Sequence, residues 1–116
     1  MKYFYSYKKN DYAALLAAYL HLEMDYNQIT EKKLKPYKLY YMGSDRKLDE
    51  VYLIKYPSSK KETLMNILNG MGYIFNENSI INDLSKYDGL FYRLYKNNIK
   101  KDIEMRVVEW RHENNL

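Results

Sequence analysis

Residues 1–22 read MKYFYSYKKNDYAALLAAYLHL, and this stretch decides the fold. Aromatic and small side chains over residues 2–7 predict a strand. The polar residues 8–11 predict a tight turn. Large apolar residues then recur at helical spacing, so we expect a helix over residues 12–22. A strand, a turn and a helix in this order are typical of the opening unit of an α/β domain.

The predicted strand carries bulky side chains on both faces. Tyr3, Tyr5 and Tyr7 share one face, and Phe4 and Ser6 share the other, because side chains alternate along a strand. Such a strand is expected to be covered on both sides. The helix that follows is apolar nearly all round, which is typical of a buried helix, and its alanines allow a close approach to a sheet.

A hairpin is expected in the middle of the chain. Residues 23–38 are polar and irregular, and we expect one helical turn over residues 30–34, before Pro36. Strands are predicted over residues 39–42 and 51–55. The polar turn between them indicates that these two strands pair in an antiparallel way.

The second half returns to alternation of helix and strand. A capping box at Ser59 begins a predicted helix that ends near Gly70. A short strand follows over residues 79–82, and a helix is predicted from Leu84 until it breaks at Asn97-Asn98. The tail beyond residue 98 fits helical spacing and strand alternation, and its charges favour a helix.

The predicted order is therefore β-α-β-β-α-β-α-α. This order indicates an α/β fold with a small mixed, mostly parallel four-stranded sheet and helices on both faces. The chain has 116 residues, which corresponds to one domain over residues 1–116. It has no cysteine, so disulfides and thiolate metal sites are excluded. No apolar run is long enough to span a membrane, and we expect a cytoplasmic protein.

The sequence is basic, with a formal net charge of +4. A basic domain can bind phosphate or an acidic partner. The lysines are spread along the whole chain, however, and the 15 tyrosines suggest the codon bias of an AT-rich genome. Composition bias is therefore the preferred interpretation of the charge.

Two segments are similar to a known family. The helix end Ala17-Ala18-Tyr19-Leu20-His21-Leu22 resembles the small bacterial domain-of-unknown-function family 3189, and so does Tyr41-Met42-Gly43-Ser44-Asp45 with the strand after it. The resemblance covers most of the chain and implies the same order of elements. It implies no activity. The family carries a turn of Gly, His and Ser after its first strand, and this chain departs from that pattern with Lys8-Lys9-Asn10-Asp11.

That turn is the first candidate ligand site. Ligands of open α/β sheets bind beyond the carboxyl ends of strands, where helix amino termini attract anions. The lysines add positive charge, but the turn lacks the glycine of a phosphate loop, and Asp11 would repel an anion. An ordinary turn, with Asn10 or Asp11 as the helix cap, is the preferred interpretation. The candidate ligand residues here are Lys8, Lys9, Asn10 and Asp11.

A second helix start offers similar groups at Ser58, Ser59 and Lys60, and capping explains them equally well. Residues 82–83 would join the same edge of the sheet if the fourth strand runs parallel to the first. His21, Glu23 and Asp25 could form a metal or acid–base cluster, but helical spacing does not place all three together, and a structural role for the histidine at the helix end is preferred. No catalytic residue, metal site or cofactor is predicted.

Three functions remain open. We expect a binding or interaction module without catalytic machinery, self-associating through the C-terminal helix near Trp110. The alternative is a protein or enzyme that binds a small phosphate or carboxylate anion at the turn after strand one. Weak nucleic-acid binding is a third function, suggested by the basic and aromatic residues Tyr92, Arg93, Tyr95, Lys96, Lys100 and Lys101. Nucleic acid is not the expected partner, because Tyr95 belongs to an apolar stripe and glutamates follow later in the chain.

Overall fold

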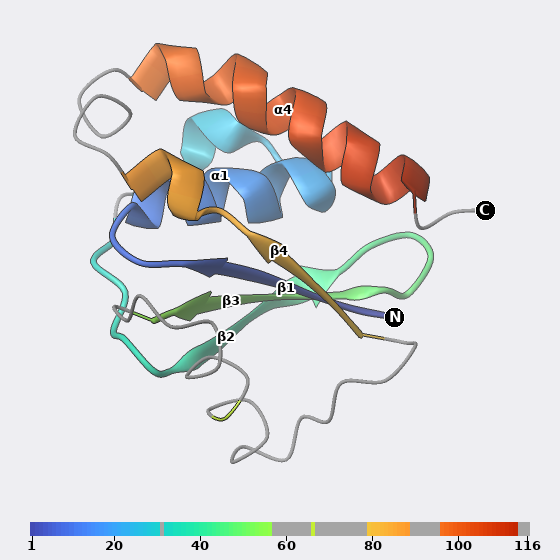
Figure 1. The fold of residues 1–116 in the computed structure, drawn as a ribbon. Helices are drawn as coiled ribbons and strands as arrows, with labels where there is room; N and C mark the ends of the chain where they lie inside the picture. Colours follow the sequence, from blue (N-terminus) through green and yellow to red (C-terminus); the bar gives the residue numbers. More distant parts are fainter. Residues whose placement is uncertain (31, 57–65, 67–78, 89–95, 114–116) are drawn as a thin grey trace.

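The computed structural model describes residues 1–30, 32–56, 66, 79–88 and 96–113 (Figure 1). They form a mixed α/β fold with a four-stranded sheet, and within them no helix is long and apolar enough to cross a membrane. The elements in chain order are β1 (Lys2–Tyr7), α1 (Asp11–His21), the 3₁₀ helix η1 (Tyr26–Gln28), β2 (Leu39–Ser44), β3 (Glu50–Lys55), β4 (Ser79–Asp83), the 3₁₀ helix η2 (Ser85–Asp88) and α4 (Lys96–Glu113).

Strand β1 lies inside the sheet, whose order is β2-β3-β1-β4. It pairs in parallel with β3, where Tyr7 faces Lys55, and with β4, where Ser6 faces Asp83. Strand β2 pairs with β3 in an antiparallel way, as the sequence predicted. The sequence left the direction of β3 relative to β1 open. Because β1, β3 and β4 are parallel, they end at one side of the sheet, which we call the carboxyl edge.

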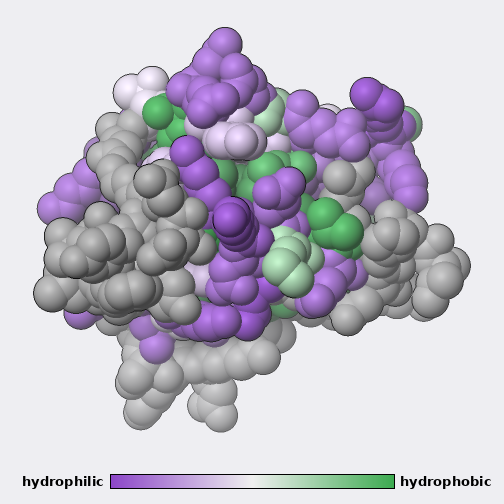
Figure 2. Space-filling model, turned by 90° about the horizontal axis from the view of Figure 1, so that it is seen from above, coloured by the Kyte–Doolittle hydropathy of each residue, from purple (hydrophilic) through white to green (hydrophobic). Residues whose placement is uncertain are grey.

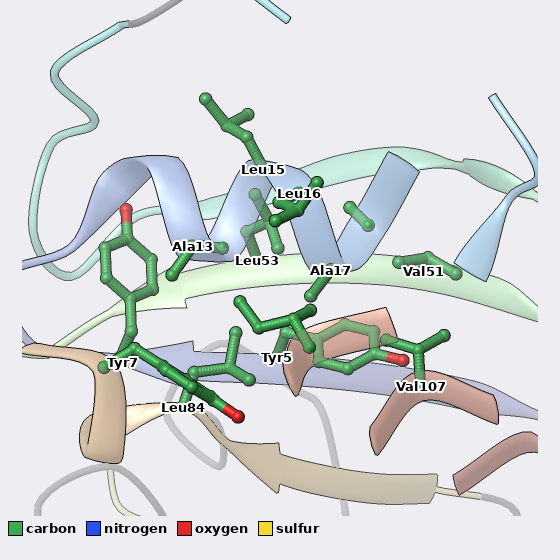
Figure 3. Close-up of a cluster of buried hydrophobic side chains, with 14 of the residues drawn as sticks. Tyr5, Tyr7, Ala13, Leu15, Leu16, Ala17, Val51, Leu53, Leu84 and Val107 are labelled. Carbon is green, nitrogen blue, oxygen red and sulfur yellow. The ribbon is translucent and has the colours of Figure 1, made fainter. Parts of the chain in front are cut away.

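The larger core lies between the sheet and the two described α-helices, which cover the same face (Figure 1). Tyr3, Tyr5 and Tyr7 are fully buried there, as the alternation in β1 predicted. Figure 3 shows α1 lying over the sheet, with the Tyr7 ring beside the start of the helix. The alanines of α1 bring its backbone close to these rings, and α4 adds a buried stripe at helical spacing, formed by Ile99, Ile103 and Val107.

The opposite face of the sheet carries a smaller apolar cluster. Phe4 and Tyr52 stack there with ring centroids 5.2 Å apart, and Ile54 and Tyr56 are buried beside them. The predicted helix over residues 59–71 falls almost entirely outside the described residues. A helix on this second face therefore stays a prediction.

Several elements differ from the predictions in their bounds. Helix α4 begins at Lys96 and includes Asn97 and Asn98, which were expected to break a helix; asparagine is well tolerated where a helix begins. The prediction of a helical turn over residues 30–34 is wrong, since the residues described there are not helical. The turn instead forms at η1, where the Asp25 side chain accepts a hydrogen bond from the amide of Asn27.

The other differences lie near β4 and in the hairpin. The helix predicted from Leu84 begins as the short η2, and residues 89–95 lie outside the described part. Strand β2 runs on to Ser44 through a bulge next to Gly43, whose φ of 141° suits glycine. The ambiguous tail is helical, as its charges favoured.

Candidate functional site

The turn after β1 is held by Asn10, which caps α1. Its side-chain oxygen accepts a hydrogen bond from the amide of Ala13 at 3.1 Å. Its side-chain nitrogen donates to the carbonyl oxygen of Tyr87 at 2.7 Å, and the residue is buried. Asn10, rather than Asp11, is therefore the cap, and it also fastens η2 to the carboxyl edge.

The Asp88 carboxylate occupies the amides of this turn. It accepts hydrogen bonds from the backbone amides of Lys8 at 3.1 Å, Lys9 at 2.8 Å and Asn10 at 2.9 Å. Amides gathered after a strand and before a helix are the groups that would bind an anion. In this fold the anion is a side chain of the protein itself. Local sequence gave no signal for this contact, because Asp88 lies 78 to 80 residues further along the chain.

Asp11 lies in a small network between β1 and β3. The Tyr7 hydroxyl donates to its carboxylate at 2.7 Å, and the Lys55 ammonium forms an ion pair with it at 3.2 Å. Burial, followed by the hydrogen bond to Asp11, raises the pKa of Tyr7 above its ordinary value. Asp11 thus neutralises a lysine that is itself largely buried.

A third carboxylate, Asp83, ends β4. Its Oδ1 atom accepts hydrogen bonds from the hydroxyls of Ser85 at 2.7 Å and Tyr56 at 3.1 Å. The Ser6 hydroxyl lies 3.4 Å away. Burial raises the pKa of the Tyr56 hydroxyl. Asp83 joins the carboxyl edge because β4 is parallel to β1, which was the condition stated from the sequence.

Residues 32–38, which we call the lysine loop, lie at the same edge (Figure 1). The Lys55 ammonium is 3.4 Å from the carbonyl oxygen of Leu34, and the amide of Tyr37 donates to the carbonyl oxygen of Lys55 at 2.8 Å. Since Lys55 faces Tyr7 in the sheet, the loop lies close to the turn after β1. Its exposed lysines are Lys32, Lys33, Lys35 and Lys38.

Within the described residues, none of these four lysines has an ion-pair partner. Lys38 lies over the ring of Tyr40, with its ammonium 5.0 Å from the ring centroid. Lys9 is also exposed, and the Lys8 ammonium lies 6.0 Å from the centroid of the Tyr56 ring. The carboxyl edge therefore presents positive charge outward, while its carboxylates are bound to donors of the chain. In the sequence these lysines match the composition bias of the whole chain, so no local signal places them at this edge.

The other predicted sites have separate outcomes. Ser58, Ser59 and Lys60 lie outside the described residues, so that site stays a prediction. His21 does not gather with Glu23 and Asp25. It is buried, with Nδ1 2.7 Å from the Tyr5 hydroxyl and Nε2 3.4 Å from the Asp45 carboxylate. No cluster of three or more potential metal-ligating side chains occurs within the described residues.

Asp45 also shapes the hairpin tip at the amino end of β3. Its Oδ1 atom accepts hydrogen bonds from the amides of Lys47 at 2.8 Å and Asp49 at 3.0 Å. An open depression of about 280 Å³ lies beside it, with Glu23 and Arg46 paired at 3.4 Å on its rim. These contacts explain His21 and Asp45 as residues that hold the hairpin against the end of α1.

No protein-family profile, curated protein or solved structure matches this chain. The resemblance to family 3189 accordingly stays an expectation.

Proposed function

We propose that this protein is a non-catalytic binding module and that its binding face is the carboxyl edge of the sheet. One observation carries the proposal: the lysine loop is fastened to Lys55, beside the turn that holds Lys8 and Lys9. Two separate segments that carry lysines thereby lie at one edge of the sheet. A face of this charge attracts an anionic partner and accelerates its association.

The carboxylates at this edge support binding over catalysis. A general acid or base needs a proton-transfer group within reach of a substrate. Asp88 is engaged by three backbone amides, and Asp11 by Tyr7 and Lys55. Both therefore serve the structure of the edge, and its exposed groups are the lysines together with Asp83, which is bound by Ser85 and Tyr56.

The same geometry argues against the alternative of a small anion bound by the amides of the turn. The Asp88 carboxylate already fills them, and an incoming phosphate would have to displace it. We therefore propose a partner that extends along the surface and contacts several lysine side chains. Attraction of this kind is screened by salt, with a Debye length of about 8 Å at physiological ionic strength.

Retention on immobilised heparin, a polyanion, tests this function. We expect the double variant Lys35→Gln/Lys38→Gln to elute at clearly lower salt than the natural protein. The matched control is Lys47→Gln/Lys101→Gln, which removes the same charge from exposed lysines of the hairpin tip and α4. The control should elute much closer to the natural protein. Equal shifts for both variants would mean that net charge alone governs retention and would contradict a binding face at this edge.

Self-association through α4 is a second candidate function. Met105 and Val108 lie one helical turn apart on the outer face of α4 and are 65% and 49% exposed. Figure 2 shows apolar atoms on the helix side scattered among hydrophilic ones. The Trp110 side chain lies outside the described part. If the protein forms a homodimer, its apparent mass in analytical ultracentrifugation should rise with concentration. At the same concentration, the apparent mass of Met105→Lys should be lower.

The remaining parts of the proposal follow from the sequence. We propose that residues 59–71 form a helix on the second face of the sheet. We also propose that the protein is bacterial, cytoplasmic and a divergent relative of family 3189.

A further inference from the structure

Tyr37 has an unusual backbone conformation for its size. Its φ is 59°, in the left-handed region, although it is neither glycine nor asparagine. A bulky residue there is a conformational outlier and costs free energy. A left-handed residue directly after a proline is typical of a type II turn, in which glycine or asparagine normally occupies this position. Pro36 precedes Tyr37, so the turn has tyrosine where a small residue would be the easier choice.

The surrounding structure holds this conformation from both sides. The Tyr37 amide is bound to the carbonyl oxygen of Lys55, and the Lys35 amide donates to the Tyr40 hydroxyl at 2.9 Å. Strained residues persist where their surroundings fix them, and they cluster at functional sites. The anchoring strand β3 is itself well buried. The turn thus presents its central side chain from a fixed backbone.

Tyr37 is exposed and lies between two lysines in the sequence. The residue is 45% exposed, and exposed lysines flank it at Lys35 and Lys38. An apolar anchor in the core would be buried, and a solubilising surface position would not need an aromatic ring. An exposed aromatic ring among lysines combines the two groups that single-stranded nucleic acids need, a stacking surface for a base and charges for the phosphates.

We propose that the carboxyl edge binds single-stranded nucleic acid, with Tyr37 as the stacking platform for a base and Lys35 and Lys38 as phosphate contacts. The inference rests on the proposed function of this edge and adds the class of partner. A duplex keeps its bases stacked inside, and an acidic peptide offers no series of flat rings. Both would use the lysines without the ring.

The test measures the fluorescence anisotropy of an end-labelled oligothymidylate titrated with the full chain at several salt concentrations. The competitors are a DNA duplex and polyglutamate, each matched in charge to the oligonucleotide. We expect the single strand to bind more tightly than either competitor. Its affinity should fall with salt, and Lys35→Gln should reduce the slope of log K against log salt by about 0.7, the value for one phosphate contact on a single strand.

The variant Tyr37→Asn separates binding from stability. Asparagine tolerates the left-handed conformation, so the melting temperature should stay the same or rise. The affinity for oligothymidylate should fall by about tenfold, the scale of one lost stacking contact. The matched control is Leu48→Asn, because Leu48 is also exposed, with a φ of 65°, but lies in the hairpin tip. Leu48→Asn should leave the affinity unchanged.

The outcomes distinguish this inference from the proposed function. Suppose that Lys35→Gln weakens binding but Tyr37→Asn does not, or that polyglutamate or the duplex binds as tightly as the single strand. The nucleic-acid inference is then wrong and the basic binding face stands. If neither the oligonucleotide nor polyglutamate binds at low salt, the binding face fails together with the inference.

Discussion

The backbone amide of Tyr37 donates a hydrogen bond to the carbonyl oxygen of Lys55 at 2.8 Å. This bond joins the lysine loop to the end of β3, and the Lys55 ammonium reaches back to Asp11 at the start of α1. Three segments that are distant in sequence are thereby held at one edge. The position of the proposed binding face depends on this junction more than on any single lysine of the loop.

Replacing Lys55 should destabilise the protein. In Lys55→Met the largely buried Asp11 carboxylate loses its cation, and we expect a loss of about 1–3 kcal/mol in the free energy of unfolding. Urea unfolding measures this loss. The control is Lys86→Met, which breaks an exposed ion pair with Asp102 and should cost about 1 kcal/mol or less. Equal losses in the two variants would contradict the structural role of Lys55.

The Asp88 carboxylate should be as important as a capping residue. Asp88→Ala leaves three backbone amides without their acceptor, so we expect a loss of about 1–3 kcal/mol in urea unfolding. Asp25→Ala is the control, since Asp25 accepts one exposed hydrogen bond in η1 and should cost less. If Asp88→Ala left the free energy of unfolding unchanged, the turn would not need an internal anion.

Inorganic phosphate offers a second test of the contact between Asp88 and the amides of the turn. The natural protein should show little rise in melting temperature with phosphate at constant ionic strength, because Asp88 occupies the amides. In Asp88→Ala these amides become available, and phosphate should raise the melting temperature. If phosphate stabilises the natural protein more than the variant, a small-anion site at Lys8, Lys9, Asn10 and Asp11 becomes the better account.

Tyr7 should make stability depend on alkaline pH. Its pKa is raised in the folded state by burial and by Asp11. Above about pH 10 the tyrosine ionises in the unfolded chain but not in the folded one, so its contribution is present below that pH and is lost as pH rises. Between about pH 9 and 11, the free energy of unfolding of the natural protein should therefore fall by roughly 1 kcal/mol more than that of Tyr7→Phe.

Two features of that experiment test the assignment. At neutral pH, Tyr7→Phe should be less stable by about 1 kcal/mol, since Asp11 loses one donor. An unchanged alkaline slope in Tyr7→Phe would mean that other groups dominate it.

The opening unit could be predicted from sequence because its signals are local. Alternation in β1 placed Tyr3, Tyr5 and Tyr7 together on one face, and the spacing of apolar residues identified α1. The hairpin followed from its polar turn. Strand directions around β1 could not be predicted, because they depend on how the chain crosses the sheet rather than on any local pattern.

The site was predictable only in part, for the same reason. The turn after β1 was predictable as a site because helix starts gather amides, but the Asp88 carboxylate that binds these amides lies 79 residues away in the sequence. The lysines of residues 32–38 resembled composition bias in a chain with 19 lysines and arginines. The hydrogen bond between Tyr37 and Lys55 places these lysines at the carboxyl edge, and no pattern of residue spacing predicts that bond.

The most direct test of the binding face is an NMR titration of the ¹⁵N-labelled protein with oligothymidylate, following backbone amide shifts. The account predicts that the largest changes fall on Lys9, Lys35, Tyr37 and Lys38, while amides on the outer face of α4, such as Lys101 and Met105, change little. Large shift changes along α4, with unchanged amide shifts in the lysine loop, would place the binding surface on the helix side and contradict the account.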